Sequence, residues 1–233
     1  MGKRAIILAG GKGTRLKPYA ISLPKPLVPI GNMPVLEIII RQLAHFGFDH
    51  ITITVNHLAE IIKAFCGNGE KWNIKIDYTF EEIQLSTMGP LTLVPNLPDN
   101  FLVMNGDVLT DLDLEKFFQD HVISNNLFTI SSYEREQIVD FGVLESKQNI
   151  LCGFREKPVL NYTVSMGVYM LNKEVIKYIP QGIPYGFDNL MVDLINKEIE
   201  VKIIPHHGYW LDIGRPDDYE KAIHDVENNT IKI

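Results

Sequence analysis

The chain contains little cysteine, no internal repeat and no apolar run long enough to cross a membrane. Its two cysteines, Cys66 and Cys152, have no metal-ligand spacing, so we expect both to be buried thiols in a reducing compartment. The segment from Met1 to Gly10 is too short and too strand-like for a signal peptide. These absences predict a soluble cytoplasmic domain without disulfide bonds.

Acidic residues are missing from the first 36 positions, where six Lys or Arg occur and after which Glu37 is the first acid. The whole chain of 233 residues nevertheless has a formal net charge of −7 at pH 7. This acidic balance argues against a general nucleic-acid or membrane-surface protein, because such proteins spread positive charge over a face. Positive charge concentrated in one segment of an acidic chain predicts a site for a polyphosphate.

Apolar, β-branched segments alternate with amphipathic ones, and the middle of the chain is rich in strand patterns. Strands are expected at residues 4–9, 51–55, 74–80, 101–104, 128–133, 141–145, 150–154, 164–171 and 201–204. Helices are expected at residues 34–46, 58–65, 114–121, 173–178, 188–196 and 217–227. The alternation predicts one α/β domain over residues 1–233, a three-layer α/β/α sandwich on a mostly parallel, mixed sheet.

The first strand ends in a glycine-rich loop, Gly10-Gly11-Lys12-Gly13-Thr14-Arg15. Glycines let backbone N–H groups approach a ligand closely, and Lys12 and Arg15 supply charge suited to phosphate. The loop lacks the Gly-Lys-Ser/Thr of a P-loop, and Leu16 stands where a dinucleotide fingerprint has its third glycine. Farther along, Pro24-Lys25-Pro26 holds a lysine between two prolines that restrict its backbone.

Two aspartates also follow apolar segments. Asp107 comes after Asn105-Gly106, and Asp212 lies within Tyr209-Trp210-Leu211-Asp212-Ile213-Gly214. Ligands of open α/β sheets bind beyond the carboxyl ends of the strands, so we expect the glycine loop and Asp107 at one edge. Two carboxylates at one site suit Mg²⁺, but an aspartate after a strand is equally a cap or turn residue. Since 105 positions separate the pair, spacing alone leaves both interpretations open.

Two further polar groups have plain interpretations. Taken alone, Arg155-Glu156-Lys157-Pro158 is typical of a solvated turn. The pair His206-His207 lacks a third ligand at metal spacing, which favours a surface loop over a zinc site.

The ordered motifs together resemble the signature of the sugar-1-phosphate nucleotidylyltransferases. The run Leu8 to Leu16 is followed by Leu23-Pro24-Lys25-Pro26-Leu27-Val28-Pro29. The resemblance covers essentially the whole chain and continues through Ser86-Thr87-Met88-Gly89-Pro90-Leu91, Asn105-Gly106-Asp107, Phe141-Gly142-Val143, Glu156-Lys157-Pro158, Gly167-Val168-Tyr169 and Trp210-Leu211-Asp212-Ile213-Gly214. It is closest in character to the mannose-1-phosphate and heptose-1-phosphate guanylyltransferases, and it implies a Rossmann-like nucleotidyltransferase domain.

The resemblance implies that a sugar 1-phosphate oxygen attacks the α-phosphorus of a nucleoside triphosphate and that pyrophosphate leaves. The product would be a nucleotide sugar, with Mg²⁺ as cofactor and GTP as the favoured nucleotide. No enzyme nucleophile is needed, so catalysis would consist of positioning and charge neutralisation. The implied partners are these two substrates, with no nucleic acid or membrane. A homo-oligomer is left open, because family members are often dimers or tetramers.

The resemblance also implies residue roles. The nucleotide would be held by Leu8, Gly10, Gly11, Gly13, Thr14, Glu81 and Gly89. Arg15 would neutralise the leaving pyrophosphate, Lys25 the α-phosphate, and Asp107 and Asp212 would bind Mg²⁺. The sugar phosphate would contact Gly142, Glu156, Lys157 and Ser165. A carboxylate of Glu81 or Glu82 can accept from both N–H groups on the guanine edge, which weakly favours guanine.

Three departures from the family pattern bear on specificity. Ser165-Met166-Gly167 replaces the common Asn-Ala-Gly, and Leu85-Ser86-Thr87-Met88-Gly89 replaces Leu-Gly-Thr-Ala-Gly. The chain also ends at Ile233 without the hexapeptide-repeat β-helix of larger members. Alternatives are a cytidylyl- or uridylyltransferase acting on another phosphorylated acceptor, or a non-catalytic nucleotide-sugar-binding subunit. A glycosyltransferase would not need Lys25 between two prolines.

Overall fold

A seven-stranded sheet forms the centre of the computed structural model, which describes residues 2–228 and 230–231. The strand order is β12 (Lys202–His206), β8 (Phe128–Ile138), β11 (Val159–Asn172), β6 (Asn100–Asn105), β1 (Lys3–Leu8), β4 (Phe48–Val55) and β5 (Lys75–Phe80). Four neighbouring pairs are parallel: β12–β8, β6–β1, β1–β4 and β4–β5. Strand β11 is antiparallel to both of its neighbours, β8 and β6. The sheet is therefore mixed and mostly parallel, as predicted.

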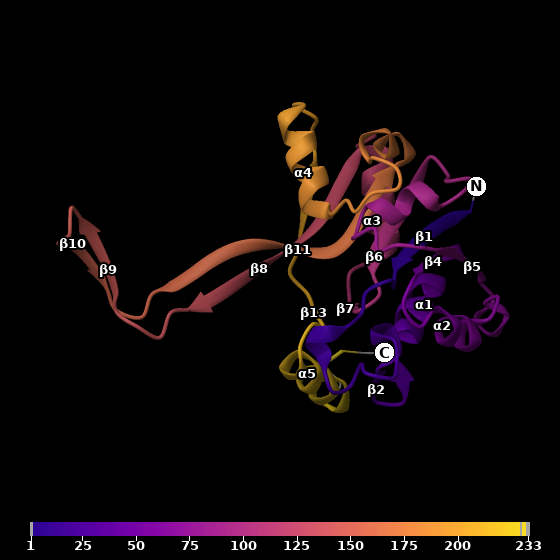
Figure 1. Cartoon of the computed structure of the whole chain (residues 1–233), viewed down its shortest axis with the longest axis horizontal. Coiled ribbons are helices and arrows are strands. Elements are labelled where there is room, and N and C mark those ends of the chain that lie inside the picture. Colours follow the sequence, from indigo (N-terminus) through magenta and orange to yellow (C-terminus); the bar gives the residue numbers. More distant parts are fainter. Residues whose placement is uncertain (1, 229, 232–233) are drawn as a thin grey trace.

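Helices cover both faces of the sheet (Figure 1). They are α1 (Val35–His45), α2 (Ala59–Cys66), α3 (Leu114–Ile123), α4 (Phe187–Asn196) and α5 (Pro216–Glu227). Successive residues of β1 point to opposite faces, so Ala5 and Ile7 join one apolar core while Ile6 joins the other. The first core includes side chains of α1, α2, α3 and α5, and the second includes side chains of α4. This confirms the predicted three-layer sandwich.

Short elements complete the chain. Three two-stranded sheets pair β2 (Pro29–Ile30) with β3 (Met33–Pro34), β7 (Val108–Thr110) with β13 (Trp210–Asp212), and β9 (Val143–Lys147) with β10 (Ile150–Arg155). The 3₁₀ turns are η1 (Thr14–Leu16), η2 (Lys25–Leu27), η3 (Glu70–Trp72), η4 (Gly89–Leu93) and η5 (Lys173–Tyr178). The helix expected at residues 173–178 is thus a 3₁₀ turn, capped by the Asn172 side chain. None of the described helices is long and apolar enough to span a membrane.

Strand β1 lies at the point where the chain changes direction across the sheet. It pairs in parallel with β4 on one side and with β6 on the other. The loops that follow β1 and β6 therefore leave the sheet at the same edge, on either side of a crevice. This position explains why the glycine loop and the Asn105-Gly106-Asp107 turn meet.

Residues 134–163 form an arm that extends away from the body (Figure 1). Strands β8 and β11 continue past the sheet as a two-stranded ribbon, paired from Glu134 with Thr163 to Ile138 with Val159. The β9–β10 hairpin forms the tip. Cys152 lies in this hairpin and is exposed, so the expectation of a buried thiol is wrong there, because no layer of the described chain covers the tip. Cys66 is buried as expected.

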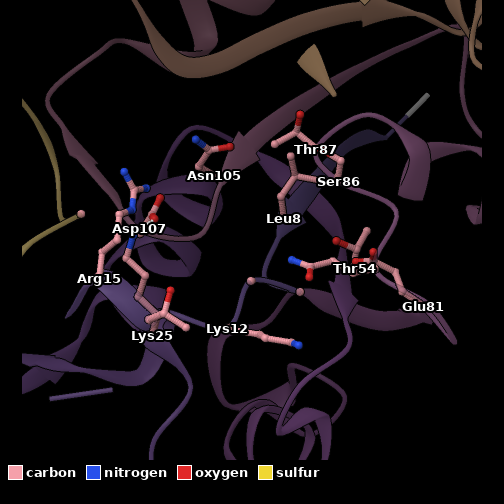
Figure 2. A pocket seen from close by; sticks show the side chains of 16 residues that line it. Leu8, Lys12, Arg15, Lys25, Thr54, Glu81, Ser86, Thr87, Asn105 and Asp107 are labelled. Atoms are coloured by element: carbon pink, nitrogen blue, oxygen red, sulfur yellow. Dashed lines mark hydrogen bonds and ion pairs between the residues drawn. The ribbon is translucent and has the colours of Figure 1, made fainter. Parts of the chain in front are cut away.

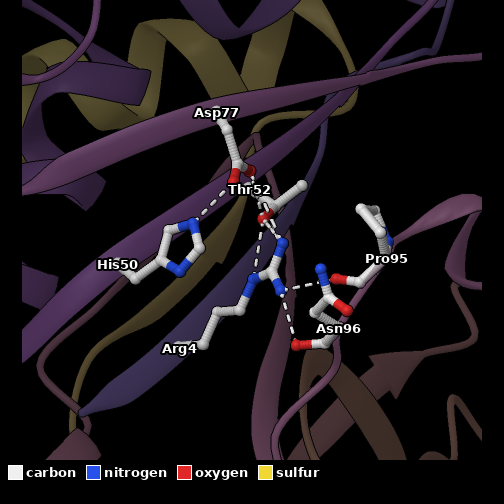
Figure 3. A network of polar contacts seen from close by, with 6 residues as sticks. All are labelled: Arg4, His50, Thr52, Asp77, Pro95 and Asn96. Carbon is white, nitrogen blue, oxygen red and sulfur yellow. Dashed lines mark hydrogen bonds and ion pairs between the residues drawn. The ribbon is translucent and has the colours of Figure 1, made fainter.

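A polar network closes the opposite edge of the sheet (Figure 3). The buried Arg4 side chain donates to Thr52 Oγ1 at 2.9 Å and to the carbonyl oxygens of Pro95 and Asn96 at 2.8 and 3.1 Å. Asp77 accepts from Thr52 Oγ1 at 2.6 Å and lies 3.6 Å from the Arg4 guanidinium. The charge of Arg4 is thus satisfied far from the glycine loop, although the sequence counts it within the basic segment.

Candidate active site

A cavity of about 470 Å³ opens at the carboxyl ends of β1 and β6 (Figure 2). It is lined by Leu8, Gly10, Gly11, Lys12, Gly13, Thr14, Arg15, Lys25, Thr54, Glu81, Gln84, Ser86, Thr87, Asn105, Asp107 and Gly214. Arg15, Lys25 and Asp107 gather at one end, whereas Thr54, Glu81, Ser86 and Thr87 lie at the other. The cavity therefore has a charged end and an end of hydroxyl groups and one acid.

The glycine loop shapes the floor of the cavity. A Cβ atom at Gly10 would lie 2.3 Å from Glu81 Oε1, so a larger residue there would displace that carboxylate. Gly13 has a φ of 62°, and a Cβ there would lie 3.1 Å from Ala20 Cβ. Lys12 and Arg15 of the same loop are exposed, so their charged groups are free to meet a ligand.

Lys25 and Asp107 form an ion pair inside the cavity. Their side chains are 13% and 20% exposed, so water screens this pair less than it screens a surface pair. Lys25 begins η2 between its two prolines, where the Leu27 N–H donates to the Pro24 carbonyl at 2.8 Å. Asp107 follows Gly106, whose N–H donates to the Leu8 carbonyl at 3.0 Å. Two tight turns thus set the lysine against the carboxylate.

Asp212 reaches the same end of the site through the β7–β13 pairing. In that ladder Asp212 lies opposite Val108, and the Ile213 N–H donates to the Asp107 carbonyl at 3.0 Å. Burial raises the pKa of Asp212, and the negative charge of Asp107 raises it further while Lys25 opposes the rise. The two aspartates, which are remote in sequence, therefore form a close acidic pair.

The acidic pair fits a divalent cation. Asp107 Oδ1 is buried without a hydrogen-bond partner in the part of the chain that the structure describes, while Asp107 Oδ2 meets Lys25. A buried carboxylate oxygen without a donor is costly, and a cation between the two aspartates would remove that cost. No cluster of three or more His, Cys, Asp or Glu suited to a metal occurs among the described residues. Two carboxylates with phosphate oxygens and waters would suffice for a hard cation such as Mg²⁺.

Glu81 lies at the other end of the cavity and is only 2% exposed. Its Oε2 accepts from the Leu85 N–H at 2.9 Å, while Oε1 lies beside Gly10. Burial raises the pKa of Glu81, and the bond from Leu85 partly opposes that rise. Glu82, the alternative that the sequence left open, is exposed and does not line the cavity. The structure thus brings Glu81, and not Glu82, to the site.

Several lining residues escaped the sequence analysis. Thr54 and Gln84 belong to none of the motifs, and Ser86, Thr87, Asn105 and Gly214 occur in the sequence only as parts of motifs without a predicted role. Thr54 sits near the end of β4, beside Leu8 in the parallel ladder. A signal for it did exist, because the ends of adjacent parallel strands share one edge.

Five residues predicted to bind substrate do not line the cavity. Gly89 is buried, and its N–H donates to the Tyr185 carbonyl at 2.9 Å. Ser165 donates to the Tyr169 hydroxyl at 3.0 Å and lies two positions before Gly167, where a Cβ would meet Asn105 Nδ2 at 2.5 Å. Ser165 is therefore near the cavity wall. Gly142, Glu156 and Lys157 lie on the arm.

Comparison with known sequences identifies the chain's relatives. The family described as "Nucleotidyl transferase" matches residues 4–229. The chain belongs to the nucleotidyl transferase family. This result confirms the resemblance found in the motifs. The matched region contains the glycine loop, Lys25 and Asp107.

Two relatives differ in the substrates that their names state. The chain is 33% identical to a UTP–glucose-1-phosphate uridylyltransferase of Synechocystis sp., over 98% of this chain and 64% of the relative. It is 31% identical to a mannose-1-phosphate guanyltransferase of Emericella nidulans, over 93% of this chain and 62% of the relative. The chain thus spans just under two thirds of the length of these family members.

Solved structures share the fold of this nucleotidyl transferase. HddC from Yersinia pseudotuberculosis, complexed with GMP-PN, is 27% identical with a TM-score of 0.75 and covers 96% of this chain and 99% of its own. A putative glucose-1-phosphate thymidylyltransferase from Bacillus anthracis is 20% identical with a TM-score of 0.78, over 100% of this chain and 97% of its own. The latter likeness concerns the fold alone.

Proposed function

We propose that this chain is a Mg²⁺-dependent sugar-1-phosphate nucleotidylyltransferase that uses GTP. It transfers the guanylyl group to a manno-configured sugar 1-phosphate, a hexose or a heptose, and releases pyrophosphate. The observation that carries the proposal is the Lys25–Asp107 pair beside Asp212, reached from the glycine loop in one cavity. Cationic and metal-binding groups at one point suit a reaction in which negative charge builds at phosphorus.

The reaction needs no nucleophile from the protein. A phosphate oxygen of the sugar 1-phosphate forms a bond to the α-phosphorus, and the bond from that phosphorus to the oxygen bridging the β-phosphorus breaks. The departing oxygen carries its electron pair into pyrophosphate, so the protein's part is alignment and charge neutralisation.

The chain's own residues supply that alignment. Backbone N–H groups of the Gly10–Gly13 loop can bind the triphosphate, and the exposed Arg15 can neutralise the β- and γ-phosphates and the leaving pyrophosphate. Lys25, fixed between two prolines, would stabilise the charge that develops at the α-phosphate. When bound by Asp107 and Asp212, Mg²⁺ supplies charge neutralisation at the transferred phosphate.

Glu81 supports guanine as the base. Guanine presents two adjacent N–H donors, and the Glu81 carboxylate can accept from that edge, whereas uracil has one such donor. HddC, whose complex contains GMP-PN, supports the same choice. The uridylyltransferase relative supports UTP as the alternative nucleotide.

The sugar phosphate would be bound by Gly142, Glu156, Lys157 and Ser165. Lys157 supplies the cation for the sugar's phosphate and Glu156 accepts from sugar hydroxyls. Support for these roles comes from the motif resemblance and from Gly142 lying beside Glu156, since a Cβ at Gly142 would be 3.3 Å from Glu156 Oε2.

A pyrophosphate-release assay tests the proposal directly. The purified protein with Mg²⁺ is given GTP, UTP, CTP, dTTP or ATP, each crossed with the 1-phosphates of mannose, a manno-heptose and glucose. Pyrophosphate with GTP and a manno-configured sugar is expected. Turnover with UTP and glucose 1-phosphate would keep the reaction class and overturn the base and sugar, while bound nucleotide without turnover would favour a non-catalytic subunit.

Glu81→Gln and Glu82→Gln form a matched pair for the base. Replacing Glu81 should lower kcat/KM for GTP relative to UTP by about tenfold, because one accepting oxygen becomes a donor. Replacing the exposed Glu82 should leave that ratio unchanged. Equal effects of the two substitutions would show that Glu81 does not select the base.

A further inference from the structure

The arm, residues 134–163, is a two-stranded ribbon without a covering layer. Residues 134–138 and 159–163 are exposed throughout, whereas the same strands are buried from Phe128 to Ser132 and from Met166 to Leu171. Among residues 2–228 and 230–231, no strand pairs with either long edge of the ribbon, because β12 pairs β8 only to Tyr133 and β6 pairs β11 only from Val168. An isolated two-stranded ribbon is marginally stable in water, so this segment needs another surface.

The arm carries several apolar side chains that are largely exposed. Phe141 is 77% exposed, Leu144 67%, Ile150 71% and Phe154 57%. Exposed apolar residues that occur singly need no explanation, but a run of them along one hairpin marks a contact surface. The arm therefore has the composition of an interface.

The arm also carries three of the residues predicted to bind the sugar phosphate. Gly142, Glu156 and Lys157 lie where the ribbon joins the tip. The Phe154 ring packs against Gly142, because a Cβ atom at Gly142 would lie only 2.7 Å from that ring. Lys157 has a φ of 42°, which is unfavourable for a lysine, and it is exposed. The joint holds a lysine and a glutamate in a defined conformation, and neither residue lines the cavity of its own chain.

The ribbon keeps this joint away from the cavity of the same chain. Its base is near the cavity, since Gly167 touches Asn105 of the cavity wall. From Ser165 to Val159 the ladder is continuous over six residues, which at a strand rise of about 3.3 Å per residue is about 20 Å. Lys157 lies beyond that point, and its side chain cannot span the gap while the ladder is paired. Figure 1 shows the tip on the far side of the ribbon from the body.

The cavity lacks a cation for a second phosphorylated substrate. Its basic side chains are Lys12, Arg15 and Lys25, and Lys25 already neutralises Asp107. On the proposed function, Lys12 and Arg15 would meet the triphosphate, while Lys25 and a cation held by Asp107 and Asp212 would serve the transferred phosphate. The sugar phosphate thus needs a further cation, which the body does not provide among the lining residues.

We propose that the arm crosses to a second copy of this chain and places Glu156 and Lys157 in the sugar-phosphate site of that copy. A two-fold axis makes the exchange reciprocal, so that both cavities are completed at once. The apolar residues of the tip are then covered by the neighbouring body. This inference rests on the proposed function, because it assigns the sugar-phosphate residues of that same site.

Mixed oligomers test the exchange. Lys25→Met, defective in the body, and Lys157→Met, defective in the arm, are co-expressed with different affinity tags, and doubly tagged assemblies are isolated. Each variant alone should be at least about 100-fold less active. In the mixed dimer one cavity combines an intact body with an intact arm, so turnover should return to about half of the wild-type value per dimer.

A second mixture, in which one chain carries both substitutions and the other is wild type, should be inactive. The double variant Lys25→Met/Lys157→Met, paired with wild type, leaves no complete site if arms are exchanged, and it leaves one complete site if each arm serves its own chain. Silent dimers are therefore expected, and half activity would overturn the proposal, as would an active wild-type monomer in size-exclusion chromatography with light scattering. Arg15→Met replaces Lys25→Met if the latter fails to fold, and Lys147→Met on the tip is the matched lysine control.

Failure of the inference is distinguishable from failure of the proposed function. Wild-type protein that releases pyrophosphate while the first mixture stays silent refutes the exchange alone. Wild-type protein that turns over no nucleotide with any sugar 1-phosphate refutes the function, whatever its oligomeric state.

Discussion

Strand β11 is buried over Met166–Leu171 in the body, yet it is exposed over residues 159–163 in the arm. Both stretches belong to one continuous strand and one antiparallel ladder with β8. They differ in their neighbours, since β6 and two helical layers cover the first, while none of the residues that the structure describes covers the second. Burial here is thus decided by what lies above and below the sheet, because strand pairing alone shields the backbone and not the faces.

The body and the arm also differ in how they hold their predicted functional residues. The body provides a preformed cavity in which Lys25 and Asp107 are held by tight turns. The arm provides Glu156 and Lys157 with no cavity around them. We therefore expect changes in the body to abolish the chemical step or the fold, and changes in the arm to act on sugar-phosphate binding and on assembly.

The largest effect is expected at Asp107 in the body. Asp107→Asn should lower kcat by at least about 10²–10³-fold, because on the proposed function it removes a carboxylate that would hold the cation and that pairs with Lys25. Nucleotide binding, followed by fluorescence of a GTP analogue, should persist. Asp217→Asn, an exposed acid at the start of α5, makes the same charge change and should retain activity. Equal activity of both variants would remove Asp107 from the reaction.

A second contrast compares one leucine from each region. Leu102→Ala, in the fully buried core, should lower the free energy of unfolding by about 2–5 kcal/mol, because the cavity left behind collapses only partly. Leu144→Ala, on the exposed tip, should change it by less than about 0.5 kcal/mol at dilute concentration. It should instead weaken self-association in sedimentation. A large loss of monomer stability for Leu144→Ala would mean that the arm packs on its own body.

The smallest effect concerns acid stability and arises from a histidine of the body. His121 is fully buried, with Nδ1 2.7 Å from Thr129 Oγ1 and Nε2 without a partner among the described residues. Burial lowers the pKa of His121 to about 4, below its ordinary value. The unfolded chain therefore binds more protons between about pH 4 and 6.5, and stability falls as the pH falls through that window.

His121→Leu should make this dependence shallower by up to about 3 kcal/mol across the window. The measurement is chemical denaturation at a series of pH values. His207→Leu, at an exposed position, is the control and should keep the wild-type slope. An unchanged slope in His121→Leu would assign the acid sensitivity to other groups.

Much of the fold was predictable from local pattern. The aliphatic run of β1, the glycine loop and the strand before Asp107 are short-range features, and their alternation with amphipathic helices indicates layers on a mostly parallel sheet. Residue spacing alone could not predict the meeting of Asp107 and Asp212, which only the family resemblance implied, because it depends on the β7–β13 ladder between distant strands of three residues each. The arm was missed for a related reason. The pattern of residues 128–133 and 164–171 indicates strands, but it does not show that the ladder continues past the sheet.

The sequence by itself determined which segments are strands, where the chain needs glycine, and that Lys25 is confined by two prolines. Only the tertiary structure decided which basic residues line the cavity. Lys3 and Arg4 open β1 and contact Glu115 and Asp77 at one edge, whereas Lys12 and Arg15 follow β1 and line the cavity at the other. These residues belong to one basic segment of the sequence. They lie at opposite ends of β1, however, and therefore have different neighbours. Charge along a sequence is local, but its partners come from strands and helices that only the folded sheet brings together.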